Sequence, residues 1–124
     1  MDMQFQEDWL VRQINSMAQA IAKAIFGKDE PEYLPDGEFP ETDRLYTRLL
    51  ELLDEKRINE AENLLFAECE EDDVAYLLVA ADFYNRVSQM DETELEDSGF
   101  SLEEAKEGLE DFAERFDVRF LTET

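Results

Sequence analysis

Carboxylates are the side chains of this sequence best suited to chemistry, because the 124 residues include no histidine and a single cysteine. Glu104, Glu107 and Glu110 follow one another at intervals of three residues. Glu68 and Glu71 have the same spacing, which places paired acids one helical turn apart. Hard cations such as Mg²⁺ bind to oxygen ligands alone. The pattern therefore leaves a carboxylate-based, Mg²⁺-dependent hydrolase of nucleotides open as one alternative function.

The same carboxylates fit a solvated surface better than a metal site. The chain contains 34 Asp and Glu residues, so acid pairs at this spacing also arise by chance. The pairs lie off the apolar stripes of their helices, whereas a buried metal site needs acids on the inward face. We expect no catalytic residue, no cofactor and no metal ligand, and hence a protein that is not an enzyme.

Other reaction and ligand classes are excluded by residue type. Without histidine there is no Ser/His or Cys/His catalysis and no di-iron site. Aligning Gly99 with the glycine of a calcium-binding loop puts Ala105 where a bidentate Glu is required. Cys69 has acidic neighbours that raise a thiol pKa, and its position predicts an inward-facing small hydrophobe.

The charge is strongly negative and unevenly distributed. The formal net charge is −23, with −6 in residues 1–57 and −17 in residues 58–124. This charge argues against nucleic acid and against a bare anionic membrane surface as partners. A second alternative function follows from it: the acidic C-terminal half mimics a nucleic acid and binds a basic protein.

Composition predicts one folded domain over residues 1–124. Hydrophobic residues make up 44% of the chain, which is enough for an independent core at this length. No apolar run approaches the roughly 20 residues of a membrane-spanning helix. The N-terminus has no secretory signal, and one cysteine cannot form an internal disulfide. We expect a cytoplasmic protein.

Apolar periodicity predicts helices, two longer polar segments between them and an apolar tail. Gly27 is placed to end the first helix, Thr42 to cap the second, and Ser101 with Glu104 to form a capping box for the last. The predicted helices cover 3–26, 43–55, 59–69, 72–90 and a stretch from Leu102. The polar segments are a Pro-rich loop at 28–41 and an acidic linker at 91–100. A tail at 117–124 follows the last helix, and we expect its Val118, Phe120 and Leu121 to dock on the body.

The helix over residues 72–90 is apolar on nearly every side, with only a narrow polar strip on which Asp82 and Arg86 are spaced to pair. Such a helix belongs in the middle of a bundle or in an interface. The hairpin over residues 43–69 is expected to pack against it. The predicted fold class is all-α, a single-domain bundle of four to five helices with this fourth helix at its centre.

Residues 49–65 resemble one helical hairpin of the tetratricopeptide type. Leu49 stands where that repeat usually has a small residue, and no second copy is evident. Because such arrays need about three repeats for a continuous core, the resemblance implies hairpin geometry and not a peptide-binding groove. The matching packing positions are Leu52, Ile58, Ala61 and Leu65.

Phe5 and Trp9 are the candidate interface residues. They lie on the same side of the helix as Arg12, Ser16 and Lys23, away from the main apolar stripe. Large aromatic side chains in such positions often mark a protein interface. A second interpretation, which the sequence leaves open, is that the loop at 28–41 folds across this helix and covers them.

The stretch from Phe5 to Ile14, with its Asp-Trp-Leu step, and the later segment 25–28 resemble the start of an uncharacterised family. The family comprises small acidic helical proteins of Gram-positive bacteria and is known only as a domain of unknown function. The resemblance covers most of the chain. It implies a helical bundle in a bacterial cytoplasm and brings no activity, cofactor or catalytic residue.

The function predicted from the sequence is a non-enzymatic, cytoplasmic protein–protein interaction or scaffold protein. Its partner is an unknown protein, with a homodimer through the helix at 3–26 as one form. The two apolar faces of the helix at 72–90 and the position of Phe5 and Trp9 away from the main apolar stripe motivate this prediction.

Overall fold

The computed structural model describes the backbone of residues 3–118 and the side chains of residues 8–118, and all secondary-structure elements in this part of the chain are helices. None of its helices is both long and apolar enough to cross a membrane. The predicted all-α class is confirmed, but there are six helices where four to five were expected. They are α1 (Met3–Phe26), α2 (Pro40–Asp54), α3 (Ile58–Glu68), α4 (Ala75–Ser88), α5 (Glu92–Asp97) and α6 (Leu102–Arg115).

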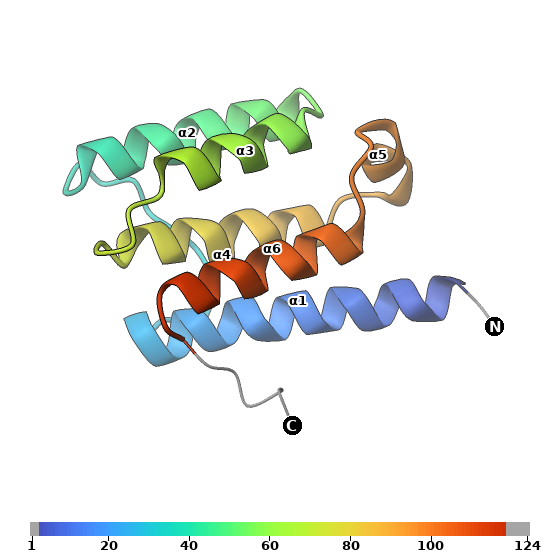
Figure 1. The fold of residues 1–124 in the computed structure, drawn as a ribbon, viewed down its shortest axis with the longest axis horizontal. Coiled ribbons are helices and arrows are strands. Elements are labelled where there is room, and N and C mark those ends of the chain that lie inside the picture. Colours follow the sequence, from blue (N-terminus) through green and yellow to red (C-terminus); the bar gives the residue numbers. More distant parts are fainter. Residues whose placement is uncertain (1–2, 119–124) are drawn as a thin grey trace.

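The helices form two layers that share α4 (Figure 1). On one side α1, α4 and α6 all pack against one another. On the other side α2 and α3 form a hairpin, and α2 packs on α4. The short α5 lies at the end of the bundle where α4 ends and α6 begins (Figure 1). The N-terminal turns of α1 project past that end (Figure 1).

The first helix begins and ends where the sequence predicts. Gly27 has φ +66°, a left-handed conformation that glycine adopts without steric cost. The N–H of Lys28 then donates to the carbonyl of Ala22 at 3.0 Å, which satisfies one of the last free carbonyls of α1. The predicted glycine cap is confirmed.

The prediction that Thr42 caps the second helix is wrong. The helix begins three residues earlier than expected, with Pro40 in its first turn and Phe39 at the N-cap position. Proline suits the first turn because its fixed φ is helical and its missing N–H would be unpaired there anyway. Thr42 is consequently inside α2 and buried.

The prediction of an acidic linker over 91–100 is also wrong, because that segment contains α5. Asp91 caps this helix by accepting from the N–H of Thr93, and Glu94 accepts from the N–H of Asp91. This is the same capping box that Ser101 and Glu104 form at α6, where it was predicted and is confirmed. In α5 the residues of the box are hard to recognise in the sequence, because most of their neighbours are also acidic. The buried side chain of Leu95 fixes this helix to the bundle.

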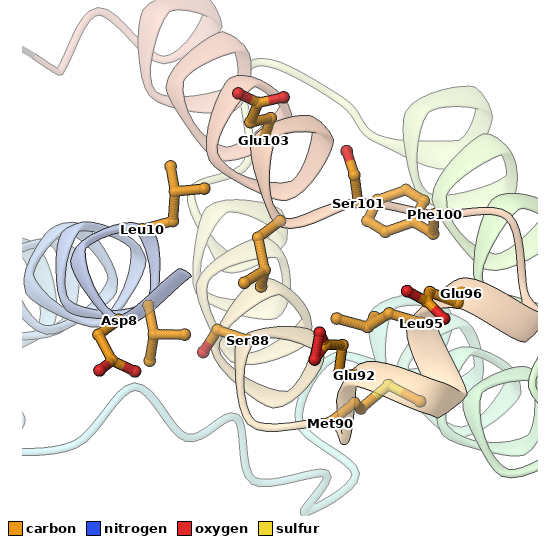
Figure 2. A pocket seen from close by; sticks show the side chains of 12 residues that line it. Asp8, Leu10, Ser88, Met90, Glu92, Leu95, Glu96, Phe100, Ser101 and Glu103 are labelled. Atoms are coloured by element: carbon orange, nitrogen blue, oxygen red, sulfur yellow. The ribbon is translucent and has the colours of Figure 1, made fainter. Parts of the chain in front are cut away.

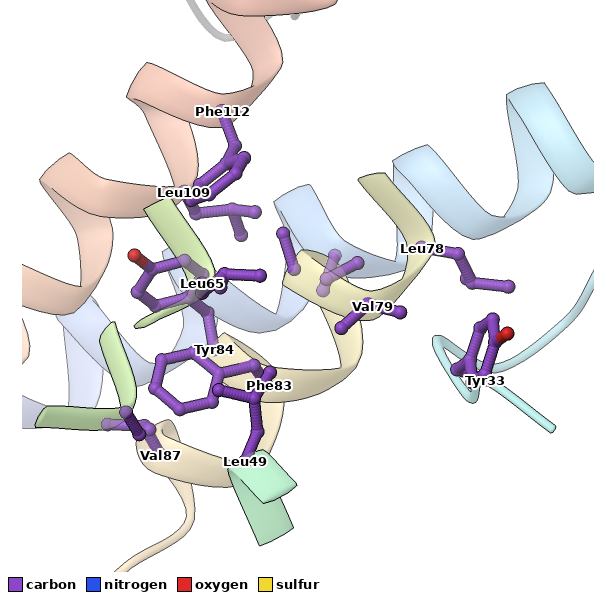
Figure 3. Packing of buried hydrophobic residues seen from close by; sticks show 14 of the residues in the cluster. Tyr33, Leu49, Leu65, Leu78, Val79, Phe83, Tyr84, Val87, Leu109 and Phe112 are labelled. Carbon is purple, nitrogen blue, oxygen red and sulfur yellow. The ribbon is translucent and has the colours of Figure 1, made fainter. Parts of the chain in front are cut away.

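The core is centred on α4, of which twelve of the fourteen residues are buried. Figure 3 shows Tyr84 between Phe83 and Phe112, with ring centroids 5.0 and 6.2 Å away. The Tyr84 hydroxyl donates to Glu62 Oε2 at 2.6 Å, directly beneath Gly108 of α6. A Cβ at Gly108 would overlap both groups, so this glycine allows α6 to approach α4 closely.

The tail is described only as far as Val118. Its side chain packs against the core, and its N–H donates to the carbonyl of Ala113 at 2.8 Å. Phe120 and Leu121, for which docking was also predicted, lie outside the described residues.

Candidate functional site

A buried carboxylate fixes the Pro-rich loop to the bundle. Asp82 of α4 is 2% exposed. Its Oδ2 accepts from the backbone N–H of Tyr33 and from the hydroxyl of Tyr46, both at 2.8 Å. Its Oδ1 accepts from Arg86 Nε at 2.6 Å. We call these four residues the Asp82 latch, because they join the loop, α2 and α4.

The latch is built for stability and leaves no reactive group. Burial, reinforced by the hydrogen bond to Asp82, raises the pKa of Tyr46 to about 12, so its hydroxyl stays protonated and keeps donating. The pKa of Tyr33 is also raised, mainly by burial and then by its hydrogen bond to Asp43. In the described residues every buried side-chain polar atom has a partner. The predicted Asp82–Arg86 pair is confirmed, but Asp82 lies inside the protein and not on a solvated strip.

Because the latch holds the loop against α4, the loop does not cover the N-terminal half of α1 (Figure 1). Trp9 is 44% exposed. Its described contact is with α6, where Lys106 Nζ lies 6.0 Å from the ring centroid. The interpretation that the loop covers Trp9 therefore does not hold. The side chain of Phe5 lies outside the described residues.

The side of α1 that carries Trp9 belongs to an acid-free part of the sequence. The twenty residues from Trp9 to Lys28 form the longest stretch without Asp or Glu and contain three of the eleven cations. We define the α1 outer face by the exposed residues on this side of the helix, which are Trp9, Arg12, Ser16, Gln19, Ala20 and Lys23. Besides Lys106 over the Trp9 ring, an exposed ion pair of 3.5 Å from Lys23 to Asp29 engages this face, and such pairs are weak.

A second surface lies on another side of the same part of α1. A hollow of about 400 Å³ lies between α1, the end of α4, α5 and the start of α6, and Figure 2 shows the side chains that line it. We call it the end groove. Its apolar lining includes Leu10, Val11, Met90 and Leu102, and its carboxylates are Asp8, Glu92, Glu96 and Glu103.

The carboxylates considered as magnesium ligands lie in different local settings of the structure. Glu104 closes the capping box of α6, and Glu110 pairs with Lys106 at 2.8 Å. Glu68 lines a shallow hollow beside Arg44. No three His, Cys, Asp or Glu side chains among residues 8–118 are arranged to hold a metal ion. Nothing in this geometry favours the hydrolase alternative.

Cys69 lies partly buried at the end of α3 and packs against the core. Burial raises the pKa of its thiol to about 11, although the nearby Arg115 acts in the opposite direction. The thiol is therefore protonated at neutral pH and a poor nucleophile. The sequence predicted that Cys69 faces inward. In the structure its side chain packs against the core but is only partly buried.

The chain belongs to the family of unknown function DUF6483, whose sequence model matches residues 4–117. No curated protein and no solved structure matches the chain. The matched region spans all six helices, so the Asp82 latch, the α1 outer face and the end groove all lie within the family domain. The expected membership of an uncharacterised family is confirmed at this level.

Proposed function

We propose that the protein is non-enzymatic and binds another protein through the α1 outer face. The family has no assigned function. One observation carries the proposal: Trp9, a large aromatic residue, is 44% exposed on the only long acid-free stretch of a chain with net charge −23. Exposed tryptophan is enriched among the residues that dominate binding energy at interfaces.

The partner that fits this face first is a second copy of the chain. Two bodies of charge −23 repel each other, and the repulsion is smallest where they meet through the surface with the fewest acids. None of the residues that define the α1 outer face is acidic, so this face suits such a contact. The apolar sides of α4 need no partner, because they are covered within one chain.

The spacing along α1 supports an antiparallel pair with its two-fold axis at Ser16. Trp9 and Lys23 are each seven residues from Ser16, so Trp9 of one copy faces Lys23 of the other. A cation over the face of an indole ring is attracted by its quadrupole. Ser16 and Ala20 are small, which lets two helices approach to about 8–10 Å.

Light scattering on the wild type and on Trp9→Ala tests the proposal. We expect a dimeric wild type and a folded, monomeric variant. Because like charges oppose this association, added NaCl should increase the dimer fraction by screening the repulsion. A monomeric wild type at high protein concentration and high salt contradicts the self-association, and so does a variant that dimerises equally well.

The cytoplasm is the proposed location, since a single, partly buried, protonated thiol suits a reducing compartment. The hydrolase alternative has no observation in its favour. The acidic-mimic alternative has a basic protein as its partner, which is attracted by the diffuse negative charge of the C-terminal half. It predicts capture of DNA-binding proteins that salt abolishes, which is the opposite salt dependence to that of the dimer.

A further inference from the structure

We propose that the end groove binds a basic amphipathic segment of another protein. The segment places a large apolar side chain in the hollow and its Lys or Arg side chains on the surrounding carboxylates. This inference concerns a different surface and a different partner from the α1 outer face, and it goes beyond the proposed function.

The apolar part of the groove is shaped to receive a side chain. Its volume of about 400 Å³ lies within the range of about 300–1,000 Å³ typical of ligand pockets. Val11, Met90 and Leu102 line it and are only partly buried. Leu95 and Phe100 lie beneath them, 6% and 4% exposed, so the floor is anchored in the core. An apolar side chain entering here covers surface that now faces water.

The polar part of the groove is of one sign. Four carboxylates come from three helices: Asp8 from α1, Glu92 and Glu96 from α5, and Glu103 from α6. None of the residues that line the groove is Lys or Arg. None of the four carboxylates forms an ion pair with another residue in the described part of the chain. Cations of a partner therefore meet free acceptors.

The helix ends around the groove keep its potential negative. The C-terminus of α4 ends there at Ser88, and the C-terminal end of a helix carries partial negative charge. The positive N-terminal ends of α5 and α6 are already satisfied by their own carboxylates, Glu94 and Glu104, in capping boxes. The charges thus select a cationic partner and disfavour an anionic one.

The occupant is a segment of another protein and not a second copy of this chain. The chain has three acids for each base, so another copy brings like charge to the groove, and its one acid-free stretch is on the α1 outer face. A helix with apolar residues at positions i and i+3 or i+4, flanked by Lys or Arg, matches the combination of an apolar floor and acidic sides.

Fluorescence anisotropy with a synthetic Lys/Leu amphipathic helical peptide tests the inference. The groove variant combines Glu92→Gln, Glu96→Gln and Glu103→Gln, which removes charge and keeps side-chain size. The matched control removes three charges from the exposed loop at the other end of α4, with Glu70→Gln, Glu71→Gln and Asp72→Asn. We expect the groove variant to bind about tenfold more weakly than the control variant, with both folded by circular dichroism.

A second peptide separates shape from charge. It keeps every Lys and replaces every Leu with Ser, and we expect it to bind at least tenfold more weakly than the Lys/Leu peptide. Equal losses for the groove and control variants would overturn the inference, because the peptide would then follow diffuse charge. Equal binding of the two peptides would overturn it as well, because the apolar floor would then contribute nothing.

The Trp9→Ala and groove variants distinguish a failure of this inference from a failure of the proposed function. Trp9→Ala should bind the Lys/Leu peptide with the wild-type affinity, because Trp9 does not line the groove. The groove variant should keep the wild-type oligomeric state in light scattering. If Trp9→Ala abolished peptide binding, the peptide would be using the α1 outer face and the assignment of the groove would be wrong.

Discussion

The Asp82 latch and the α1 outer face differ in how their polar and aromatic side chains are placed: the first is centred on a buried, fully hydrogen-bonded carboxylate, and the second is exposed. In the latch a carboxylate is 2% exposed and every donor around it has an acceptor. On the α1 outer face Trp9 is 44% exposed, and the cations beside it have at most weak, exposed partners. The difference separates two roles. Damage to the latch should cost stability, and damage to the outer face should cost association alone.

Asp82→Ala should have the largest effect on stability. It leaves the buried N–H of Tyr33 and the hydroxyl of Tyr46 without their acceptor. Arg86 is partly exposed and can turn to water, so we expect a loss of about 3 kcal/mol in the free energy of unfolding, measured by urea denaturation. Asp54→Ala, at an exposed position of α2, is the control. A loss below about 1 kcal/mol for Asp82→Ala would contradict the structural role of the latch.

Gly108→Ala should follow, at about 2 kcal/mol. In an exposed helix this change stabilises, because alanine has the higher helix propensity. Here the new Cβ overlaps the Tyr84 hydroxyl and the Glu62 carboxylate, so α6 must move away from α4, and overpacking of this kind is destabilising. The neighbouring Glu107→Ala should change stability little. Thermal unfolding of the two variants gives the comparison, and a stabilised Gly108→Ala would show that the contact is loose.

Glu62→Gln should alter how stability depends on pH. Burial raises the pKa of this carboxyl above its usual 4.5, although the Tyr84 hydrogen bond opposes the shift. A folded-state pKa above the unfolded one means that the folded protein holds the proton more tightly, so stability falls as pH rises through that window. Glutamine removes the titration and still accepts from Tyr84. The variant should gain stability relative to wild type as the pH rises above 4.5, and a constant difference in denaturation midpoint would refute this.

Trp9→Ala should have the smallest effect on stability, less than about 1 kcal/mol, because the side chain is half-exposed and outside the core. Trp9→Phe is the conservative control and should retain part of the association. Chemical denaturation at a concentration where the protein is monomeric checks the prediction. A loss as large as that of Asp82→Ala would make Trp9 a structural residue and remove the contrast between the two regions.

Helix ends that depend on neighbouring residues could be predicted from the sequence. Gly27 and the box of Ser101 with Glu104 are local signals, and the C-terminal end of α1 and the start of α6 follow them. Local competition explains the errors. Pro40 begins α2 before Thr42 can cap it, and the box at Asp91 was hidden in an acidic run.

Features that depend on distant residues could not be predicted. Asp82 meets Tyr33 and Tyr46, which are 49 and 36 residues away in sequence, so its burial depends on how the loop and α2 cross α4. The end groove likewise brings together α1, α4, α5 and α6. The side of α1 that carries Trp9 was visible as a helical stripe, but only the packing of the loop on α4 shows that this loop does not cover Trp9.

Cross-linking through Ser16→Cys, in a Cys69→Ser background, tests the central claim most directly. In an antiparallel α1 pair the two cysteines meet at the two-fold axis, close enough for a disulfide. A cysteine on α2, Arg48→Cys in the same background, is the matched exposed control. The account predicts rapid formation of covalent dimer for Ser16→Cys under mild oxidation and little for Arg48→Cys. Equal, slow cross-linking of both variants would contradict the pairing of α1 outer faces.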